Sequence, residues 1–205
     1  MTSSRPAFQE VAAQWDERYR DQDRVWRVEP NEILVDLLRD VTVGSAVDLG
    51  AGEGRNALWL AQQHWHVTAV DASTVGLAKV ARYAEEAGLS IETIVEDIWA
   101  FTARSQASKT SFDLVVLAYL QVSKDERAEL LELAAGLVGP GGHLFVIAHH
   151  MDSLGISGPP DAERLFVEAD LAAVPGLTQE RLELWRGPSD QAVRGTDVFL
   201  WAARH

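Results

Sequence analysis

The chain has 205 residues, 31 of them acidic and 18 basic, which gives a formal net charge of -13 at pH 7. This charge opposes binding to phosphate backbones and anionic lipid surfaces, and no run of Lys and Arg offsets it. The chain contains no cysteine, which excludes disulfides, thiolate-bound zinc, cysteine-held iron–sulfur clusters and a cysteine nucleophile. We therefore expect a small-molecule partner, no nucleic acid, no membrane and no metal.

Length and apolar content suit one folded domain. The first residues lack an apolar signal core, and no apolar run approaches the roughly 20 residues that a membrane span needs. We expect a cytoplasmic enzyme. The sequence does not indicate an oligomeric state.

Two helices are predicted before the first strand. Residues 7–20 have the apolar spacing of an amphipathic helix, and residues 31–38 follow Pro30, which forces a non-helical entry with Asn31 as the N-cap. We expect residues 1–40 to form a helical lid that belongs to the same domain as residues 41–205.

Strands and helices then alternate along the chain. Short runs rich in Val, Ile and Leu predict buried parallel strands at residues 45–49, 66–70, 90–95, 112–118 and 143–148. Helical spacing occupies residues 56–64, 75–87 and 124–137, the last closed by Gly139-Pro140-Gly141-Gly142. Residues 178–185 and 196–203 alternate around a turn at residues 186–190, as in an antiparallel hairpin. The predicted fold is α/β and Rossmann-like: a doubly wound, mainly parallel seven-stranded sheet that ends in an antiparallel hairpin, with helices on both faces.

A glycine-rich turn follows the first predicted strand, in the sequence VDLGAGEGRN. Glycines at alternate positions, Gly50, Gly52 and Gly54, let a ligand approach the backbone closely. Open parallel sheets bind ligands at this place, beyond the carboxyl ends of their strands. A P-loop is excluded because the lysine-containing motif is missing and Glu53 would oppose a triphosphate.

The glycine spacing and one acidic residue favour S-adenosylmethionine (SAM) over a dinucleotide. The dinucleotide motif is G-x-G-x-x-G, whereas here the glycines run G-x-G-x-G. Asp48 precedes the first glycine by two residues, where it would repel a pyrophosphate but suits a ligand with a sulfonium and an ammonium group.

Two further acidic positions end the next strands. Asp71 can accept hydrogen bonds from both hydroxyls of a ribose, a role common to SAM and NAD sites, or it can serve only as an acid at the start of a helix capped by Ser73. Asp97 and Ile98 offer a carboxylate and an apolar side chain to an adenine, although a plain turn is the alternative there.

The motif VDLGAGEGRNALWLA resembles the first motif of class I SAM-dependent methyltransferases, in particular the small bacterial proteins related to tellurite-resistance and thiopurine methyltransferases. Members of that group typically carry W-D-x-R-Y, then a Trp and Glu-Pro-Asn before the first strand; here these are Trp15-Asp16-Glu17-Arg18-Tyr19, Trp26 and Glu29-Pro30-Asn31. The resemblance covers most of the chain and is strongest up to Ala148. The predicted SAM-binding residues are Trp26, Asp48, Gly50, Ala51, Gly52, Asn56, Asp71, Ala72, Ser73, Asp97, Ile98, Ala118 and Tyr119.

The resemblance implies methyl transfer from SAM to a small-molecule acceptor by in-line displacement, with S-adenosylhomocysteine as product. The acceptor could be a thiol, a selenium or tellurium species, or another small nucleophile. His149 and Tyr119 are the predicted catalytic residues, with His150 and Asp152 as further candidates for a base just past the fifth strand. Relatives often have Tyr-Leu-His where this chain has Tyr119-Leu120-Gln121, so no acid–base role is copied from them. A non-catalytic SAM-binding protein and an NAD-type oxidoreductase remain as alternatives.

Overall fold

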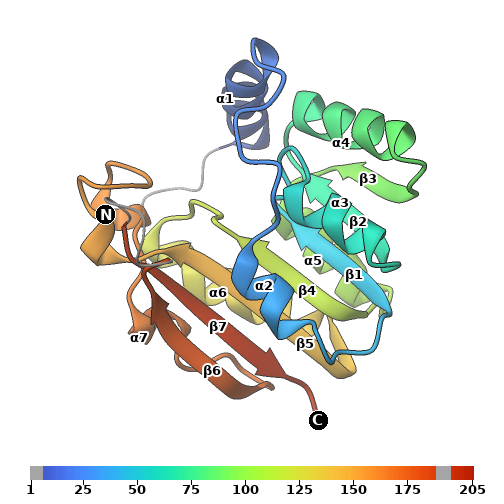
Figure 1. Ribbon diagram of the computed structural model, residues 1–205. Helices are drawn as coiled ribbons and strands as arrows, with labels where there is room; N and C mark the ends of the chain where they lie inside the picture. The colour runs from blue at the N-terminus through green and yellow to red at the C-terminus, as the bar shows by residue number, and fades with distance from the viewer. Residues whose placement is uncertain (1–6, 188–194) are drawn as a thin grey trace.

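The computed structural model describes residues 7–187 and 195–205, which form one seven-stranded sheet with helices on both faces (Figure 1). The strand order is β3-β2-β1-β4-β5-β7-β6, with β7 antiparallel to both of its neighbours and the other pairs parallel. The strands are β1 Ser45–Leu49, β2 His66–Asp71, β3 Ile91–Val95, β4 Phe112–Ala118, β5 Val138–His149, β6 Thr178–Trp185 and β7 Asp197–Ala203. This arrangement confirms the predicted fold class.

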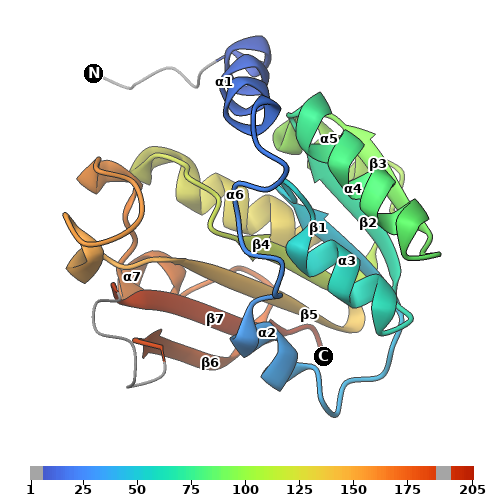
Figure 2. The ribbon, with the colours of Figure 1, turned by 45° about the horizontal axis from the view of Figure 1, so that its top comes forward.

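Seven α-helices surround the sheet within the described residues. They are α1 Phe8–Arg20, α2 Glu32–Leu37, α3 Arg55–Gln62, α4 Thr74–Glu86, α5 Ile98–Ala107, α6 Lys124–Gly136 and α7 Glu168–Leu171. Apolar side chains of α2, α3 and α4 pack on one face of the sheet, and those of α5, α6 and α7 pack on the other. Because the central strands are buried on both faces, their sequences read as continuous apolar runs. Figure 2 shows the two layers of helices from a second direction.

Helix α5 was missed by the sequence analysis, which expected no helix between the third and fourth strands. Its buried positions are Ile98, Phe101, Thr102 and Ser105, which have the spacing of one helical face. Two of these four are hydroxyl residues, so the apolar pattern is interrupted. The Thr102 hydroxyl is satisfied by donating to the Ile98 carbonyl at 2.8 Å, and this local bond permits its complete burial.

The fifth strand is longer than predicted. The glycines that were expected to end α6 belong to β5, which begins at Val138. A Cβ at Gly142 would lie 2.9 Å from the carbonyl oxygens of Phe112 and Asp113, so only glycine fits there. The register of β4 against β5 shifts at this point, between Phe112 and Leu114.

The N-terminal helices lie on the side where the ligand site was expected. Helix α1 packs against α4, and the following segment crosses in front of the sheet to α2 (Figures 1 and 2). Asn31 caps α2 as predicted, its side-chain oxygen accepting from the amides of Ile33 and Leu34 at 3.0 and 3.3 Å. Part of the predicted hairpin turn, residues 188–190, lies outside the described residues. Within residues 7–187 and 195–205, no helix is long and apolar enough to cross a membrane.

Candidate active site

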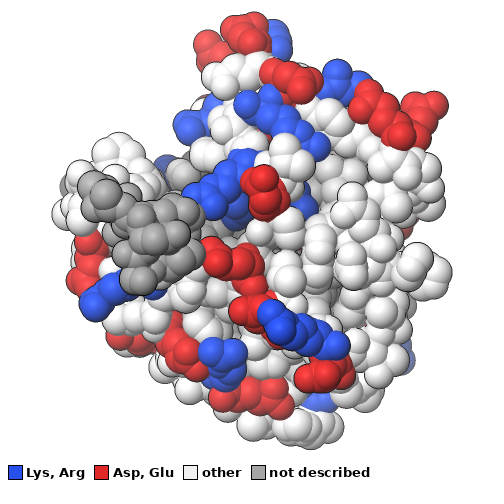
Figure 3. All heavy atoms as spheres, in the orientation of Figure 1, with Lys and Arg blue, Asp and Glu red and all other residues white. Residues whose placement is uncertain are grey.

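A cavity of about 530 Å³ lies at the carboxyl ends of β1, β2, β4 and β5 and is closed in part by α1 and the segment after it. This volume is in the usual range for small-molecule sites. Of the predicted site residues, the following line the cavity: Trp26, Asp48, Gly50, Ala51, Gly52, Asn56, Asp71, Ala72, Asp97, Ile98, Ala118, Tyr119 and His149. On the face shown in Figure 3, Lys and Arg side chains gather over the segment that links α1 to α2, with acidic side chains beside them.

The glycine turn has the backbone geometry that the sequence predicts. Gly50, Gly52 and Gly54 all have positive φ, at 75°, 57° and 76°, a region that only glycine adopts readily. A Cβ at Gly52 would lie 2.8 Å from the Tyr19 hydroxyl oxygen, and one at Gly50 would lie 2.7 Å from Leu120. The turn therefore needs glycine both for its backbone angles and for the close approach of side chains.

Asp71 fixes this turn from the end of β2. Its Oδ2 accepts a hydrogen bond from the Gly52 amide at 2.8 Å, and its Oδ1 accepts from the Ser73 amide at 2.7 Å. Burial raises the pKa of Asp71, and the two amide bonds oppose that rise. Each oxygen keeps a further lone pair, so the carboxylate can still accept from a ligand.

Asp48 is a buried carboxylate at the end of β1, and 2% of its surface is exposed. Burial raises its pKa to about 7, an effect opposed by the charge of Arg55 and reinforced by Asp71. A cation that entered the cavity beside Asp48 would offset this desolvation and favour the ionised carboxylate.

Ser73 and Asp97 also serve as helix caps. Ser73 is fully buried, and its hydroxyl accepts from the Gly76 amide at 2.9 Å and donates to Asp16 at 2.5 Å. Among the described residues that line the cavity, Ser73 is not found. Asp97 caps α5 by accepting from the Trp99 amide at 2.8 Å and still lines the cavity.

Glu53 ties the N-terminal segment to the glycine turn, a role that sequence reasoning missed. Its buried carboxylate accepts from the amides of Val25 and Trp26 at 2.9 and 3.0 Å and pairs with Lys79 at 2.7 Å. The signal available in the sequence was the charged residue between two glycines, because such a turn is buried and a charge within it needs partners.

Aromatic residues of the N-terminal segment form one wall of the cavity. Trp15 stacks on Tyr19 with ring centroids 5.6 Å apart, and the Trp26 indole nitrogen donates to the Tyr19 hydroxyl at 3.3 Å. Trp15, Tyr19 and Trp26 all line the cavity. That residues 1–40 form a lid over the site stays a prediction.

A histidine and a carboxylate meet at the opposite wall. His149 Nδ1 lies 2.9 Å from Asp197 Oδ1, and the Tyr119 hydroxyl donates to Asp197 Oδ2 at 2.7 Å. Asp197 was not predicted as a site residue. It lies directly opposite His149 in the antiparallel pairing of β5 with β7, so the register of that pairing was the signal.

Comparisons with known proteins agree with this geometry. Residues 46–142 match the family described as "Methyltransferase domain". The matched segment is a little under half of the chain. Among curated proteins, it is 27% identical over 143 residues to a ubiquinone biosynthesis O-methyltransferase of Serratia proteamaculans (strain 568), which covers 67% of this chain and 57% of that protein. The chain thus spans less than two thirds of the length of the curated relatives it matches.

Two solved structures illustrate the shared fold. TehB from Haemophilus influenzae superposes with a TM-score of 0.69 at 18% identity and covers 86% of this chain and 63% of its own. The N-methyltransferase NodS from Bradyrhizobium japonicum WM9, in complex with S-adenosylhomocysteine, superposes with a TM-score of 0.71 at 17% identity, covering 95% and 98%. These findings agree with the prediction of a class I, SAM-dependent methyltransferase. Because the sequence identity to the two solved structures is only 18% and 17%, their likeness to this chain concerns the fold alone.

The other histidine after β5 does not line the cavity. His150 is buried, its Nε2 lies 3.2 Å from Glu168, and its Nδ1 accepts from the Asp152 amide at 3.1 Å. Neither His150 nor Asp152 lines the cavity, whereas Gln121 and Ser157 do. Of the candidates for a base, the structure brings only His149 to the site among the described residues.

Proposed function

We propose that the protein transfers a methyl group from SAM to a small-molecule acceptor. When bound, SAM supplies an electrophilic methyl group on a sulfonium centre. The observation that carries the proposal is Asp48, a carboxylate buried at the end of β1 and beside the glycine turn, in the wall of the cavity. A buried carboxylate is costly unless cations offset its charge, and a sulfonium or ammonium group in the cavity would add to the effect of Arg55.

The residues present fit the remaining parts of SAM. Asp71 offers lone pairs to ribose hydroxyls from an orientation fixed by two backbone amides. Asp97 and Ile98 line the cavity next to the third strand, where an adenine amino group and ring would meet a carboxylate and an apolar surface. Asp48, beside the glycine turn, would repel a pyrophosphate, which disfavours an NAD-type oxidoreductase.

The N-terminal segment would act as the lid over this site. Glu53 holds the backbone of Val25 and Trp26 against the glycine turn, and Asp16 accepts from the Val75 amide at 3.0 Å at the start of α4. In-line displacement needs the nucleophile, methyl carbon and sulfur held in line with water excluded, and a lid anchored to the ligand-binding turn supplies both.

We further place the chain in the small bacterial group that is related to tellurite-resistance and thiopurine methyltransferases. Support comes from the W-D-x-R-Y element, because Asp16 bonds to the cap of α4 and Tyr19 packs on Gly52. Tyr19 lines the cavity next to the glycine turn, where we expect the cofactor. The acceptor end departs from the group at Gln121, so the acceptor has to be inferred from other residues. The cytoplasmic location stays a prediction.

Incubation of the purified protein with methyl-labelled SAM and a panel of thiol, selenite, tellurite and phenol acceptors tests the proposal. We expect labelled product and S-adenosylhomocysteine to form together with at least one acceptor class. Tight SAM binding without transfer to any class would instead indicate a non-catalytic SAM-binding protein. Asp48→Asn serves as the control, since it should lower SAM affinity and turnover together.

A further inference from the structure

The hydrogen bonds around Asp197 all point toward its carboxylate, which places a proton of His149 on Nδ1. The Asn31 side-chain amide lies 3.4 Å from the Tyr119 hydroxyl and donates to it, so that hydroxyl uses its own proton toward Asp197 Oδ2. Burial, reinforced by the Asp197 charge, raises the pKa of Tyr119, so its proton stays in place. Asp197 Oδ1 is then left to accept from His149 Nδ1 at 2.9 Å.

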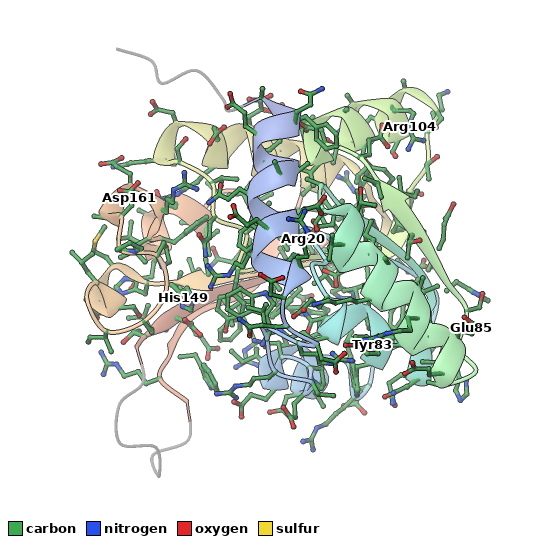
Figure 4. The ribbon with its side chains drawn as sticks, turned by 90° about the horizontal axis from the view of Figure 1, so that it is seen from above. Arg20, Tyr83, Glu85, Arg104, His149 and Asp161 are labelled. Carbon is green, nitrogen blue, oxygen red and sulfur yellow. The ribbon has the colours of Figure 1, made fainter. Side chains whose placement is uncertain are left out.

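This arrangement leaves the second ring nitrogen of His149 as an acceptor. With the proton held on Nδ1, Nε2 of the neutral ring carries a lone pair. Within residues 7–187 and 195–205, Nε2 has no hydrogen-bond partner, and 24% of the side chain is exposed. The ring lines the cavity, and Figure 4 shows His149 in the view from above at the start of the loop that follows β5.

Aromatic side chains also mark the acceptor end. The Tyr119 ring lies against the His149 ring with centroids 4.7 Å apart, and Trp185, which pairs with Asp197 between β6 and β7, lines the same cavity. Flat apolar walls of this kind suit a planar ring better than a small inorganic anion.

We propose that His149, oriented by Asp197, is the general base for a phenol-class acceptor that arrives as a neutral hydroxyl. This inference rests on the proposed function. A thiolate or a chalcogen oxyanion can attack without losing a proton, so a positioned base would serve no purpose for it. For a phenol, the base decides the rate. Asp197 and Tyr119 are positioning residues in this scheme.

The proposed step transfers one proton and one methyl group. The hydroxyl proton moves to His149 Nε2, so the O–H bond breaks and an N–H bond forms. The oxygen lone pair forms the new bond to the methyl carbon, while the methyl–sulfur electron pair stays with sulfur and yields the neutral thioether. The proton then leaves His149 to solvent.

The first test uses the protein alone. Nitrogen-15 NMR of histidine-labelled protein at about pH 8 should show His149 with its proton on Nδ1. Asp197→Asn should shift the ring toward the Nε2-protonated tautomer, since the amide can donate to Nδ1. Glu168→Gln, the matched change at the His150 pair, should leave the His149 signals unchanged. An Nε2-protonated ring in the wild type, or no change in Asp197→Asn, would overturn the inference.

The second test compares two probes, catechol and 4-nitrothiophenol, the latter being largely ionised at neutral pH. His149→Gln should lower kcat for catechol about 10²- to 10⁴-fold, with KM and the calorimetric affinity for SAM nearly unchanged. Its kcat for the thiolate, if the wild type accepts it, should change little. Asp197→Asn should lower kcat for catechol selectively as well, but by a smaller factor, and His150→Gln should not lower it.

The outcomes separate this inference from the proposed function. Equal losses for both probes would mean that His149 is structural and would overturn its role as base. A wild type that binds SAM but does not methylate catechol would overturn the acceptor class and leave SAM-dependent transfer standing. A folded wild type that takes up no SAM would overturn both proposals.

Discussion

Replacing Asp71 by Asn tests the ribose assignment, because it changes one atom and the charge while it keeps the shape. The two carboxylate oxygens of Asp71 accept from the Gly52 and Ser73 amides at 2.8 and 2.7 Å. An Asn side chain has one acceptor oxygen, so whichever way the amide turns, one backbone N–H must face an NH₂ group. That N–H loses its partner in a site where 8% of the residue is exposed.

The expected magnitudes follow from these two contacts. An unsatisfied buried N–H costs about 1 to 3 kcal/mol, so the free energy of unfolding should fall by that amount. Loss of charge-assisted bonds to a ribose should weaken SAM binding by about 1 to 3 kcal/mol, or roughly 5- to 150-fold. Urea unfolding measures the first quantity and calorimetric titration with SAM the second.

Asp113→Asn is a matched control for this change. Asp113 also accepts from a backbone amide, that of Ser45 at 2.7 Å, but it is exposed and does not line the cavity. This variant should lose stability without losing SAM affinity. Folded Asp71→Asn protein with wild-type affinity would refute the ribose role, and an equal affinity loss in Asp113→Asn would show that the effect is not local.

Three further predictions concern the glycine turn and its neighbours. Because burial raises the pKa of Asp48 to about 7, SAM binding below that pH should release a proton, and the affinity for SAM should rise with pH toward 7 by up to about tenfold per pH unit. Calorimetric titration in buffers of different ionisation enthalpy measures the proton release, and Asp48→Asn should abolish it. Glu53→Gln removes the only carboxylate that pairs with Lys79 among the described residues and leaves that ammonium with the carbonyls of Tyr19 and Gln22. We expect it to cost about 3 kcal/mol of unfolding free energy, measured with urea, and to speed proteolysis near Val25; wild-type stability would contradict the anchoring role. Gly52→Ala should lower both Tm and SAM affinity, whereas Gly88→Ala, at a similar φ but with no atom within 4 Å of the added Cβ, should lower Tm alone.

The sequence was informative wherever structure is local. Buried parallel strands give mainly apolar runs, and alternate glycines indicate a turn with positive φ, so the sheet and the backbone of the turn were predictable. Helix α5 was not, because Thr102 and Ser105 occupy buried positions and interrupt the apolar pattern. The Thr102 hydroxyl donates to the Ile98 carbonyl within the helix, which periodicity alone cannot reveal.

The residues that were missed act across long separations in the chain. Asp197 reaches His149 only through the register of β5 with β7, 48 residues apart. Glu53 meets the backbone of Val25 only when the N-terminal segment docks on the turn, 28 residues away. Both contacts are tertiary, and the sequence around a charged residue in a glycine turn or at a strand end does not predict which residue it contacts.

Calorimetric titration of the purified protein with SAM, S-adenosylhomocysteine and NADH tests most directly whether the turn after β1 holds a sulfonium ligand. We expect SAM and S-adenosylhomocysteine to bind at a single site, with affinity lowered by Asp48→Asn and Asp71→Asn, and NADH to give no heat of binding. Saturable uptake of NADH together with failure to bind SAM would contradict the account.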